Sequence, residues 1–373
     1  MAVFPHFFVI LHSEMELMQF SAVVLLTLLA LKLLLLPKKV GVNPVVGNAR
    51  WLMTAGIVLL DIQFLLQYTL GLRAMGVTQA VMVNLLLFIP CSWNISLSIL
   101  FLQRRGHVST LDRWLGGIVW LIALLLIGTA AYIDGQPLFS DTPELHWAEV
   151  ASSVLYLLLQ GHYSWRHLKN LRSMRKTLQN YYDRDMDGML LWMQLSILVL
   201  MILAMMVPLL IFVESKGLAI FGILFFAGIF YLVDSFSNYV VSSAPKRMLE
   251  AEESEDEKEE DTDQANFSAQ LITKWINNGG YLQIGMKLPT TAEAIGIPQY
   301  QLSAWVKQQG LTYAGWITSL RIEEAKRMLC EHPDWNNETV AQHCGFSDRS
   351  YFQTVFKKET GMTPSDFQEM KNQ

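Results

Sequence analysis

Long apolar stretches fill the first two thirds of the chain, whereas its last third mixes apolar and polar residues at a helical spacing. About 20 mostly apolar residues in a helix can cross the hydrocarbon core of a bilayer. The sequence therefore predicts an all-α protein, in which a polytopic transmembrane helical bundle of about seven spans precedes a polar, all-helical domain. The seven apolar stretches lie near residues 16–36, 51–70, 78–102, 115–133, 145–163, 188–213 and 217–241.

Basic residues between these stretches favour one side of the predicted bundle. With the N-terminus outside, the cytoplasmic loops and the segment after the last span hold 14 Lys and Arg residues, and the external loops hold only Arg73 and Lys216. Cytoplasmic loops of membrane proteins accumulate such residues, so the C-terminal domain is expected in the cytoplasm. This excess of basic residues on the cytoplasmic side holds only if residues 145–163 span the membrane, and that stretch is the least hydrophobic of the seven. The first 15 residues lack Lys and Arg, which favours a retained anchor over a signal peptide.

Two charged segments follow the apolar stretches. Residues 164–187 are rich in Arg and Lys and are expected to form a wide loop on anionic lipid headgroups. Residues 250–263 contain ten acidic residues and a single Lys, which predicts a solvated, flexible spacer. An acidic decoy that competes with a polyanion is the alternative interpretation of this segment. The predicted domains are a transmembrane helical, sensor-like domain at 1–243, an acidic linker at 244–266 and a helical domain at 267–373.

Several polar side chains lie at membrane depth in the predicted spans. Such groups are costly to bury in lipid, so they face a cavity, a ligand or another helix. Hydrogen bonding between helices is their commoner role, and together they predict a candidate pocket for a signal. The candidate ligand residues are Asp61, Asn84, Trp93, Asn94 and Asp234.

The remaining composition argues against an enzyme or a metal site. The three cysteines form no CxxC or Cys/His cluster, which argues against a disulfide scaffold and a structural zinc site. No Ser/His/Asp or Glu/His grouping appears in the apolar stretches. We therefore expect no catalytic residue, no metal and no cofactor.

The last third of the chain predicts a pair of short helices joined by a tight turn. Tyr351, Phe352, Val355 and Phe356 fall on one face of a helix, and the opposite face is polar. A second short helical pattern precedes them and ends at Gly345, a residue that tolerates the positive φ of a turn. This arrangement is typical of a helix-turn-helix unit.

A similar unit lies upstream. Ala292 and Gly296 repeat the spacing of Ala341 and Gly345, and a further amphipathic segment follows them. A long helix is predicted between the two units and is expected to stop at Pro333. Its inward positions are predicted to be Trp316, Ile317, Leu320, Ala325, Met328 and Leu329.

The last hundred residues or so resemble the AraC/XylS family of bacterial transcription regulators. The resemblance rests on "RIEEAKRML" and on "VAQHCGFSDRSYFQTVFKKETGMTPSDF", and it does not extend to the apolar part of the chain. The matching positions are Arg321, Ile322, Ala325, Leu329, Ala341, Gly345, Phe346, Ser350, Tyr351, Phe352, Phe356, Lys357, Gly361 and Pro364. The resemblance implies two helix-turn-helix units joined by a long helix, with the second helix of each entering successive major grooves of double-stranded DNA.

The resemblance also implies a DNA-binding face. Arg and Gln can each make paired hydrogen bonds to a base, and Lys residues hold phosphates. The implied base-reading residues of the second unit are Arg349, Ser350, Gln353 and Thr354, with Lys357 and Lys358 on phosphates; the first unit offers Gln299, Tyr300, Ser303 and Lys307. This chain has Ala304 where family members commonly carry a basic residue.

Residues 267–373 carry ten Lys and Arg against ten Asp and Glu, whereas nucleic-acid binders usually have a basic excess. A single domain is therefore expected to bind weakly, and a homodimer would raise the effective concentration of the second domain.

The favoured interpretation is a membrane-embedded transcription regulator of the bacterial cytoplasmic (inner) membrane, with the lipid bilayer, operator DNA and an unknown signal ligand or membrane protein as partners. The alternatives are a membrane transporter or enzyme with an accessory helical domain, a DNA-binding domain released by proteolysis in the linker, and a helical interaction module that no longer binds DNA.

Overall fold

The computed structural model describes eight segments of the chain, and every element named among them is a helix. Among the described residues, one isolated β-bridge joins Tyr182 and Lys287. The prediction of an all-helical fold is therefore confirmed. The described segments are residues 4–37, 44–70, 77–133, 140, 142–184, 186–209, 215–242 and 265–372.

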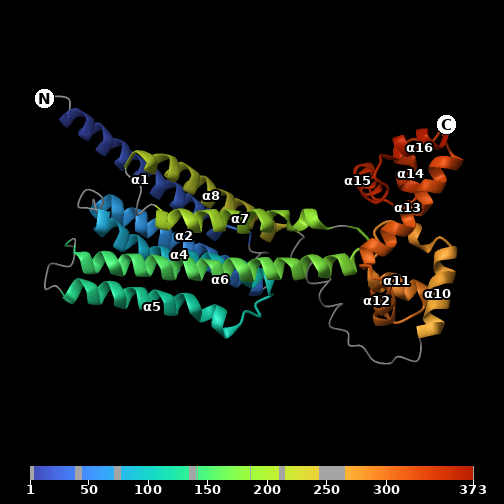
Figure 1. Cartoon of the computed structure of the whole chain (residues 1–373), viewed down its shortest axis with the longest axis horizontal. Coiled ribbons are helices and arrows are strands. Elements are labelled where there is room, and N and C mark those ends of the chain that lie inside the picture. Colours follow the sequence, from blue (N-terminus) through green and yellow to red (C-terminus); the bar gives the residue numbers. More distant parts are fainter. Residues whose placement is uncertain are drawn as a thin grey trace. The chain divides into compact units, whose positions relative to one another are not determined.

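The chain divides into two compact units. Unit 1 comprises Met1–Leu171 and Leu191–Pro245, and unit 2 comprises Arg172–Leu190 and Lys246–Gln373. The described part of unit 1 is a set of long helices, shown from blue to yellow-green in Figure 1. They are α1 (Phe4–Leu34), α2 (Pro44–Leu70), α4 (Val77–Gln103), α5 (Thr110–Ile133), the larger parts of α6 (Pro143–Tyr181) and of α7 (Asp187–Leu209), and α8 (Ser215–Val241).

Helix packing in unit 1 centres on α2 and α4, with α1 against α2 and α5 against α4. Gly56 of α2 allows the close approach, because a Cβ at this position would lie 2.7 Å from Ile95 Cγ1 and 3.1 Å from the Cys91 carbonyl oxygen. Inside a bilayer the lipid tails are as apolar as the helix surfaces, so helices associate mainly through close packing, which small residues permit. The same device recurs on α5, where the ring of Trp93 covers Gly116.

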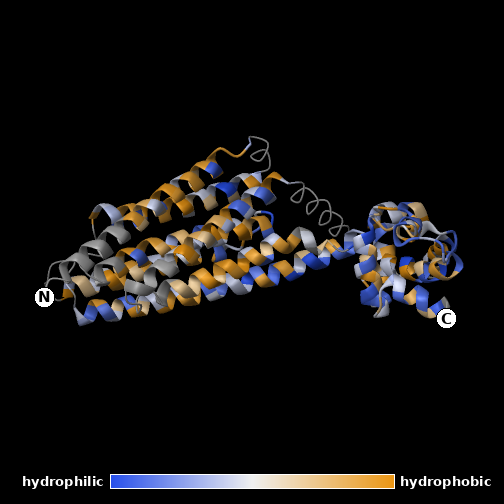
Figure 2. Ribbon diagram, turned by 90° about the horizontal axis from the view of Figure 1, so that it is seen from above, coloured by the Kyte–Doolittle hydropathy of each residue, from blue (hydrophilic) through white to orange (hydrophobic). Residues whose placement is uncertain are grey.

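Five helices of the described residues are long and apolar enough to cross a membrane. Hydrophobic residues predominate along these helices, as the colouring of the ribbon in Figure 2 shows. The seven-span prediction is not confirmed, because α6 does not reach this hydropathy and the apolar part of α7, Leu190–Met206, is shorter. The five candidate spans are Leu17–Leu34, Pro44–Leu70, Val81–Gln103, Thr110–Ile133 and Gly222–Val241.

The predicted wide loop at 164–187 is wrong over most of its length, since α6 continues unbroken to Tyr181. The segment contains no Gly or Pro after position 163 that would end the helix. Leu171, Met174 and Leu178 recur at helical spacing and are buried. The Lys and Arg residues therefore lie along a helix rather than in a loop.

Unit 2 contains two small hydrophobic cores, one for each helix-turn-helix unit. Its helices are α10 (Ala265–Asn277), the 3₁₀ turn η2 (Gly280–Leu282), α11 (Leu288–Ile295), α12 (Gln299–Gln308), α13 (Tyr313–Glu331), α14 (Asn337–His343), α15 (Arg349–Thr360) and α16 (Pro364–Asn372). The acidic segment 250–263, and with it most of the linker predicted at 244–266, lies outside the described residues. Helix α13 ends two residues before Pro333, as predicted.

Candidate nucleic-acid interface

The second helix-turn-helix unit is built from α14 and α15, and side-chain caps fix where both helices start. The Asn336 side chain accepts a hydrogen bond from the Thr339 backbone N–H at 2.9 Å, and Asp348 accepts one from Tyr351 N–H at 2.7 Å. Gly345 turns the chain between them with φ +80°. These local signals explain why the two short helices form where the sequence predicts them.

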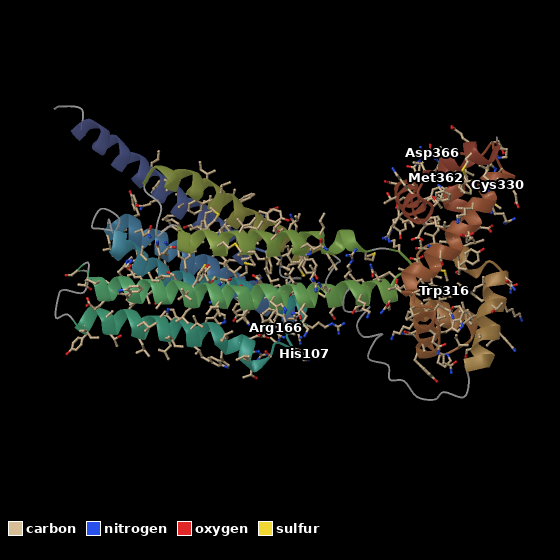
Figure 3. All side chains as sticks on the ribbon, viewed as in Figure 1. His107, Arg166, Trp316, Cys330, Met362 and Asp366 are labelled. Carbon is tan, nitrogen blue, oxygen red and sulfur yellow. The ribbon has the colours of Figure 1, made fainter. Side chains whose placement is uncertain are left out.

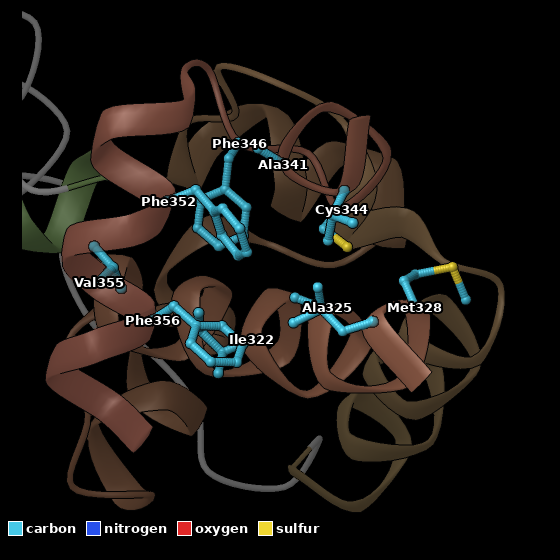
Figure 4. Packing of buried hydrophobic residues seen from close by; sticks show 11 residues of the cluster. Ile322, Ala325, Met328, Ala341, Cys344, Phe346, Phe352, Val355 and Phe356 are labelled. Carbon is cyan, nitrogen blue, oxygen red and sulfur yellow. The ribbon is translucent and has the colours of Figure 1, made fainter. Parts of the chain in front are cut away.

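A row of phenylalanine rings packs α15 against the rest of unit 2 (Figure 4). Phe346, Phe352, Phe356 and Phe367 follow one another with ring centroids 5.1 to 5.6 Å apart. The first three are at most 1% exposed. Cys344 lies in the same core, where burial raises the pKa of its thiol to about 12, so this cysteine packs as an apolar residue. The apolar face of α15 is thus fully used in packing.

The opposite face of α15 is polar and accessible, and it carries every residue predicted for the second unit. The hydroxyl of Thr354 donates to the Ser350 carbonyl oxygen at 2.9 Å, so it is partly satisfied within its own helix. Arg349 starts the helix directly after its cap. Exposed on this face are Arg349, Ser350, Thr354, Lys357 and Lys358, with Gln353 half-buried.

The first unit is α11, a glycine turn and α12. Gly296 adopts φ +83° between the helices, and Leu302 and Val306 anchor α12 in the core. Of the predicted contact residues, Lys307 is exposed, whereas Gln299, Tyr300 and Ser303 are half-buried. The Tyr300 hydroxyl oxygen accepts a hydrogen bond from Gln301 at 3.2 Å. This face is more recessed and less basic than that of α15.

Helix α13 joins the two units and carries the inward residues that the sequence predicts. Trp316, near its start in Figure 3, is buried against Trp275, Trp305 and Tyr313. The Tyr313 hydroxyl shares a 2.6 Å hydrogen bond with Thr291, which ties α13 to α11, and burial raises the pKa of Tyr313. Of the six inward positions predicted, only Leu320 is half-buried rather than buried.

A buried ion pair in unit 2 was missed by the sequence analysis. Arg321 donates to the carbonyl oxygens of Tyr281 (2.9 Å) and Gln283 (2.6 Å), and to Asp183 Oδ2 at 2.8 Å. The side chains of Arg321 and Asp183 are 3% and 4% exposed. The Arg321 guanidinium also lies over the ring of Phe346, 5.9 Å from its centroid. The pair therefore joins α13, the segment before α11, the turn before α15 and the end of α6.

The five candidate ligand residues of unit 1 each contact different partners. Asp61 accepts a hydrogen bond from Thr27 at 2.8 Å. Asn84 accepts from Gln63 at 2.7 Å and from Gln67. None of the hydrogen bonds found among the described residues joins two of the five candidates, so a shared pocket stays a prediction. The other contacts are Trp93 over Gly116 and Gly117, Asn94 to the Pro90 carbonyl oxygen at 2.7 Å, and Asp234 with Lys32 at 2.5 Å and Asn238 at 3.0 Å.

A further polar cluster of unit 1 lies between α5 and α6. Asp112, 2% exposed, accepts hydrogen bonds from Arg166 Nε at 3.0 Å and from Ser109 at 2.7 Å, and lies 2.9 Å from His162 Nε2. The Tyr163 hydroxyl donates to the Asp112 carbonyl oxygen at 2.8 Å. Arg166 lies along α6 in Figure 3. Among the described residues, no group of three His, Cys, Asp or Glu is arranged to hold a metal ion.

Comparisons with known proteins concern unit 2. Residues 291–370 match the family model described as a helix-turn-helix domain. The regulatory protein PocR of Salmonella typhimurium is 30% identical over 94 residues, which cover 25% of this chain and 31% of PocR. The HTH-type transcriptional activator RhaR of Salmonella arizonae is 39% identical over 66 residues, which cover 18% of this chain and 23% of RhaR.

The similarity is thus limited to less than a third of each relative's length. No solved structure matches the chain. The matched residues begin within α11 and end within α16, so they include both helix-turn-helix units and the helix between them. The C-terminal part of this chain is an AraC-type helix-turn-helix domain.

Proposed function

We propose that this protein is a membrane-embedded transcription regulator of the bacterial inner membrane. The observation that carries the proposal is one chain that combines five helices able to cross a membrane with an AraC-type domain whose α15 face is polar, basic and exposed. The N-terminus lies outside, the bundle is multi-pass, and unit 2 works in the cytoplasm. The protein binds operator DNA from the membrane and acts as a regulator, not as an enzyme.

Sequence recognition is assigned to α15, assisted by α12. Arg349 can pair with guanine and Gln353 with adenine through two hydrogen bonds each, while Ser350 and Thr354 offer hydroxyls to either. Lys357 and Lys358 hold phosphates, which fix position without reading sequence. In the first unit, Gln299, Tyr300, Ser303 and Lys307 contribute the equivalent contacts.

Tight binding to DNA is assigned to a homodimer of the protein. Residues 267–373 have equal numbers of acidic and basic residues, so a single domain lacks the excess positive charge that drives DNA affinity. Two domains held to one bilayer make the second binding event intramolecular and raise its effective concentration.

Binding of the signal is assigned to unit 1. A small amphiphile or a membrane partner shifts the equilibrium between two arrangements only if it binds one of them better. The polar residues Asp61, Asn84, Trp93, Asn94 and Asp234 are the candidates for that contact, because polar groups at membrane depth are costly unless they serve packing or binding.

Selection from a random duplex library tests the proposal. The full chain, reconstituted in nanodiscs with anionic lipid, is incubated with the library, and retained DNA is sequenced. Each domain should enrich two short elements with centres about 10 base pairs apart, because its two units face successive major grooves on one side of the duplex. Retention without any enriched motif, at several salt concentrations, would contradict a sequence-specific regulator.

A further inference from the structure

The last turns of α6 belong to unit 2, although the rest of the helix belongs to unit 1. We call Arg172–Leu190 the docking segment. Within it, the carboxylate of Asp183 is buried and accepts hydrogen bonds from Arg321 at 2.8 Å and from the Met286 backbone N–H at 2.9 Å. The Asp183 N–H donates in turn to the Met286 carbonyl oxygen at 3.2 Å. A buried carboxylate with these partners holds the segment firmly, because leaving either charge unpaired is costly.

The docking segment also contacts the start of the first helix-turn-helix unit. Tyr182 pairs with Lys287 in an antiparallel bridge, directly before α11. The Lys287 ammonium lies over the rings of Tyr181 and Tyr182, at 5.7 and 5.8 Å from their centroids. Both tyrosines are buried. A basic residue at the start of α11 is therefore engaged by the docking segment.

A third contact reaches the start of the second unit. Arg184 Nη1 donates to the Ser347 hydroxyl at 3.2 Å, and Ser347 precedes Arg349 by two residues. In Figure 1 the end of α6 lies between α15 and α12, and Arg184 places the residues that follow it next to Ser347, just before α15. The exposed face of α15, which begins at Arg349, carries the residues proposed to read DNA.

We propose that the docking segment is an autoinhibitory element that stands beside the DNA-facing side of unit 2. The side chains proposed to read DNA stay exposed or half-buried next to it, so it hinders the approach of a duplex rather than covering those side chains. The inference rests on the proposed function, because it takes the outward faces of α12 and α15 as the DNA-binding surface. Asp183 and Arg184 contact Met286, just before α11, and Ser347, just before α15, so a duplex that spans α12 and α15 would meet the docking segment on its path. Undocking then precedes full engagement of DNA, and a signal in unit 1 acts by shifting the balance between docked and undocked forms.

A disulfide that locks the docked form tests the inference. Residues opposite each other in an antiparallel bridge have Cα atoms about 4.5–5.5 Å apart, within the range that a disulfide spans. The variant is Tyr182→Cys/Lys287→Cys in the full chain in nanodiscs, with the exposed Cys330 changed to Ser. The single variant Tyr182→Cys on the same background is the control for intermolecular links.

The reduced and oxidised forms are compared for binding to the duplex enriched in the library selection and to a random duplex. The oxidised form should bind the enriched duplex about tenfold or more weakly than the reduced form, because apparent affinity scales with the competent fraction. Equal or tighter binding by the oxidised form would overturn the proposal and favour a clamp that aligns the two units. Failure of the disulfide to form would also overturn it, because the docked form would not be populated.

A pair of charge variants provides a second readout. Asp183→Asn keeps the shape of the side chain and removes the charge that faces Arg321, whereas Asp334→Asn makes the same change at an exposed position of unit 2. Asp183→Asn should bind the enriched duplex more tightly than wild type, and Asp334→Asn should not. Weaker binding by Asp183→Asn with unchanged helicity would contradict autoinhibition. A disulfide that forms in a protein with no preference for any duplex would instead overturn the proposed function, and the inference with it.

Discussion

Arg349 and Lys358 lie on the same exposed face of α15 but offer different chemistry to a duplex. Arg349→Ala should relax preference at one base pair and cost about 1–3 kcal/mol on the selected site, because it removes a paired hydrogen bond to a base. Lys358→Ala should weaken binding to all sequences similarly, because it removes a phosphate contact. For the same reason it should lower the slope of log affinity against log salt concentration by about one. Titrations against the selected site, its point variants and random DNA, at several salt concentrations, measure both.

Lys371→Ala is the matched control for these two variants, since Lys371 is exposed on α16, away from the proposed face. It should leave affinity and salt slope close to wild type. Equal losses on specific and random DNA for Arg349→Ala and Lys358→Ala would contradict the two assigned roles.

At the residue scale, the sequence identified the exposed face of α15 but not the Arg321–Asp183 pair. Ile317, Arg321 and Ala325 share one face of α13 at spacing i, i+4, and the outer two are fully buried. An arginine between two buried positions requires a partner, and this signal was available. The identity of the partner was not, because Asp183 lies 138 positions away and outside the matched motif.

At the element scale, the sequence predicted the helices of the two helix-turn-helix units because local signals agree there. Amphipathic spacing, Asp348 and Asn336 as caps and the glycine turns all favour the same boundaries. At the end of α6 the Arg and Lys residues suggest a loop, whereas the helical spacing of Leu171, Met174 and Leu178 is the signal that the structure follows. Helix α10 was not predicted as a separate element, although Ile272 packs in the core of the first unit.

Two glycines of unit 2 allow the stability cost of backbone strain to be distinguished from the cost of a steric clash. Gly310 and Gly345 both have positive φ, at +72° and +80°. A Cβ at Gly310 would have no neighbour within 4 Å, whereas one at Gly345 would lie 2.5 Å from the Leu282 carbonyl oxygen. Gly310→Ala should therefore cost about 1–2 kcal/mol through strain alone. Gly345→Ala should cost about 1–3 kcal/mol more, because the backbone around Leu282 has to move.

Hydrogen exchange of the full chain measures these costs as the free energy of local opening. Amides of α14 and α15 should lose more protection in Gly345→Ala than amides of α12 and α13 lose in Gly310→Ala. Equal losses in the two variants would show that the contact with Leu282 contributes nothing.

At the scale of the whole molecule, the sequence separated an apolar part from a helix-turn-helix part, and hydropathy alone was enough for that. The number of spans was harder to predict. The region of α6 at 145–163 includes Glu149, Gln160 and His162 among its apolar residues, and these lower its hydropathy below that of the other candidates. The same helix contributes its last turns to unit 2, so a contact between distant segments, rather than a composition change, sets that boundary.

Chromatin immunoprecipitation with sequencing shows whether the membrane-borne protein binds specific chromosomal sites through α15. Full-length protein recovered from the membrane fraction is compared with the Arg349→Ala/Gln353→Ala variant, with equal expression and membrane recovery verified. Discrete chromosomal peaks are expected for wild type; they should share the motif from library selection and be lost in the variant. Absence of peaks for wild type under several growth conditions, or peaks that persist unchanged in the variant, would contradict a membrane-embedded regulator that reads DNA through α15.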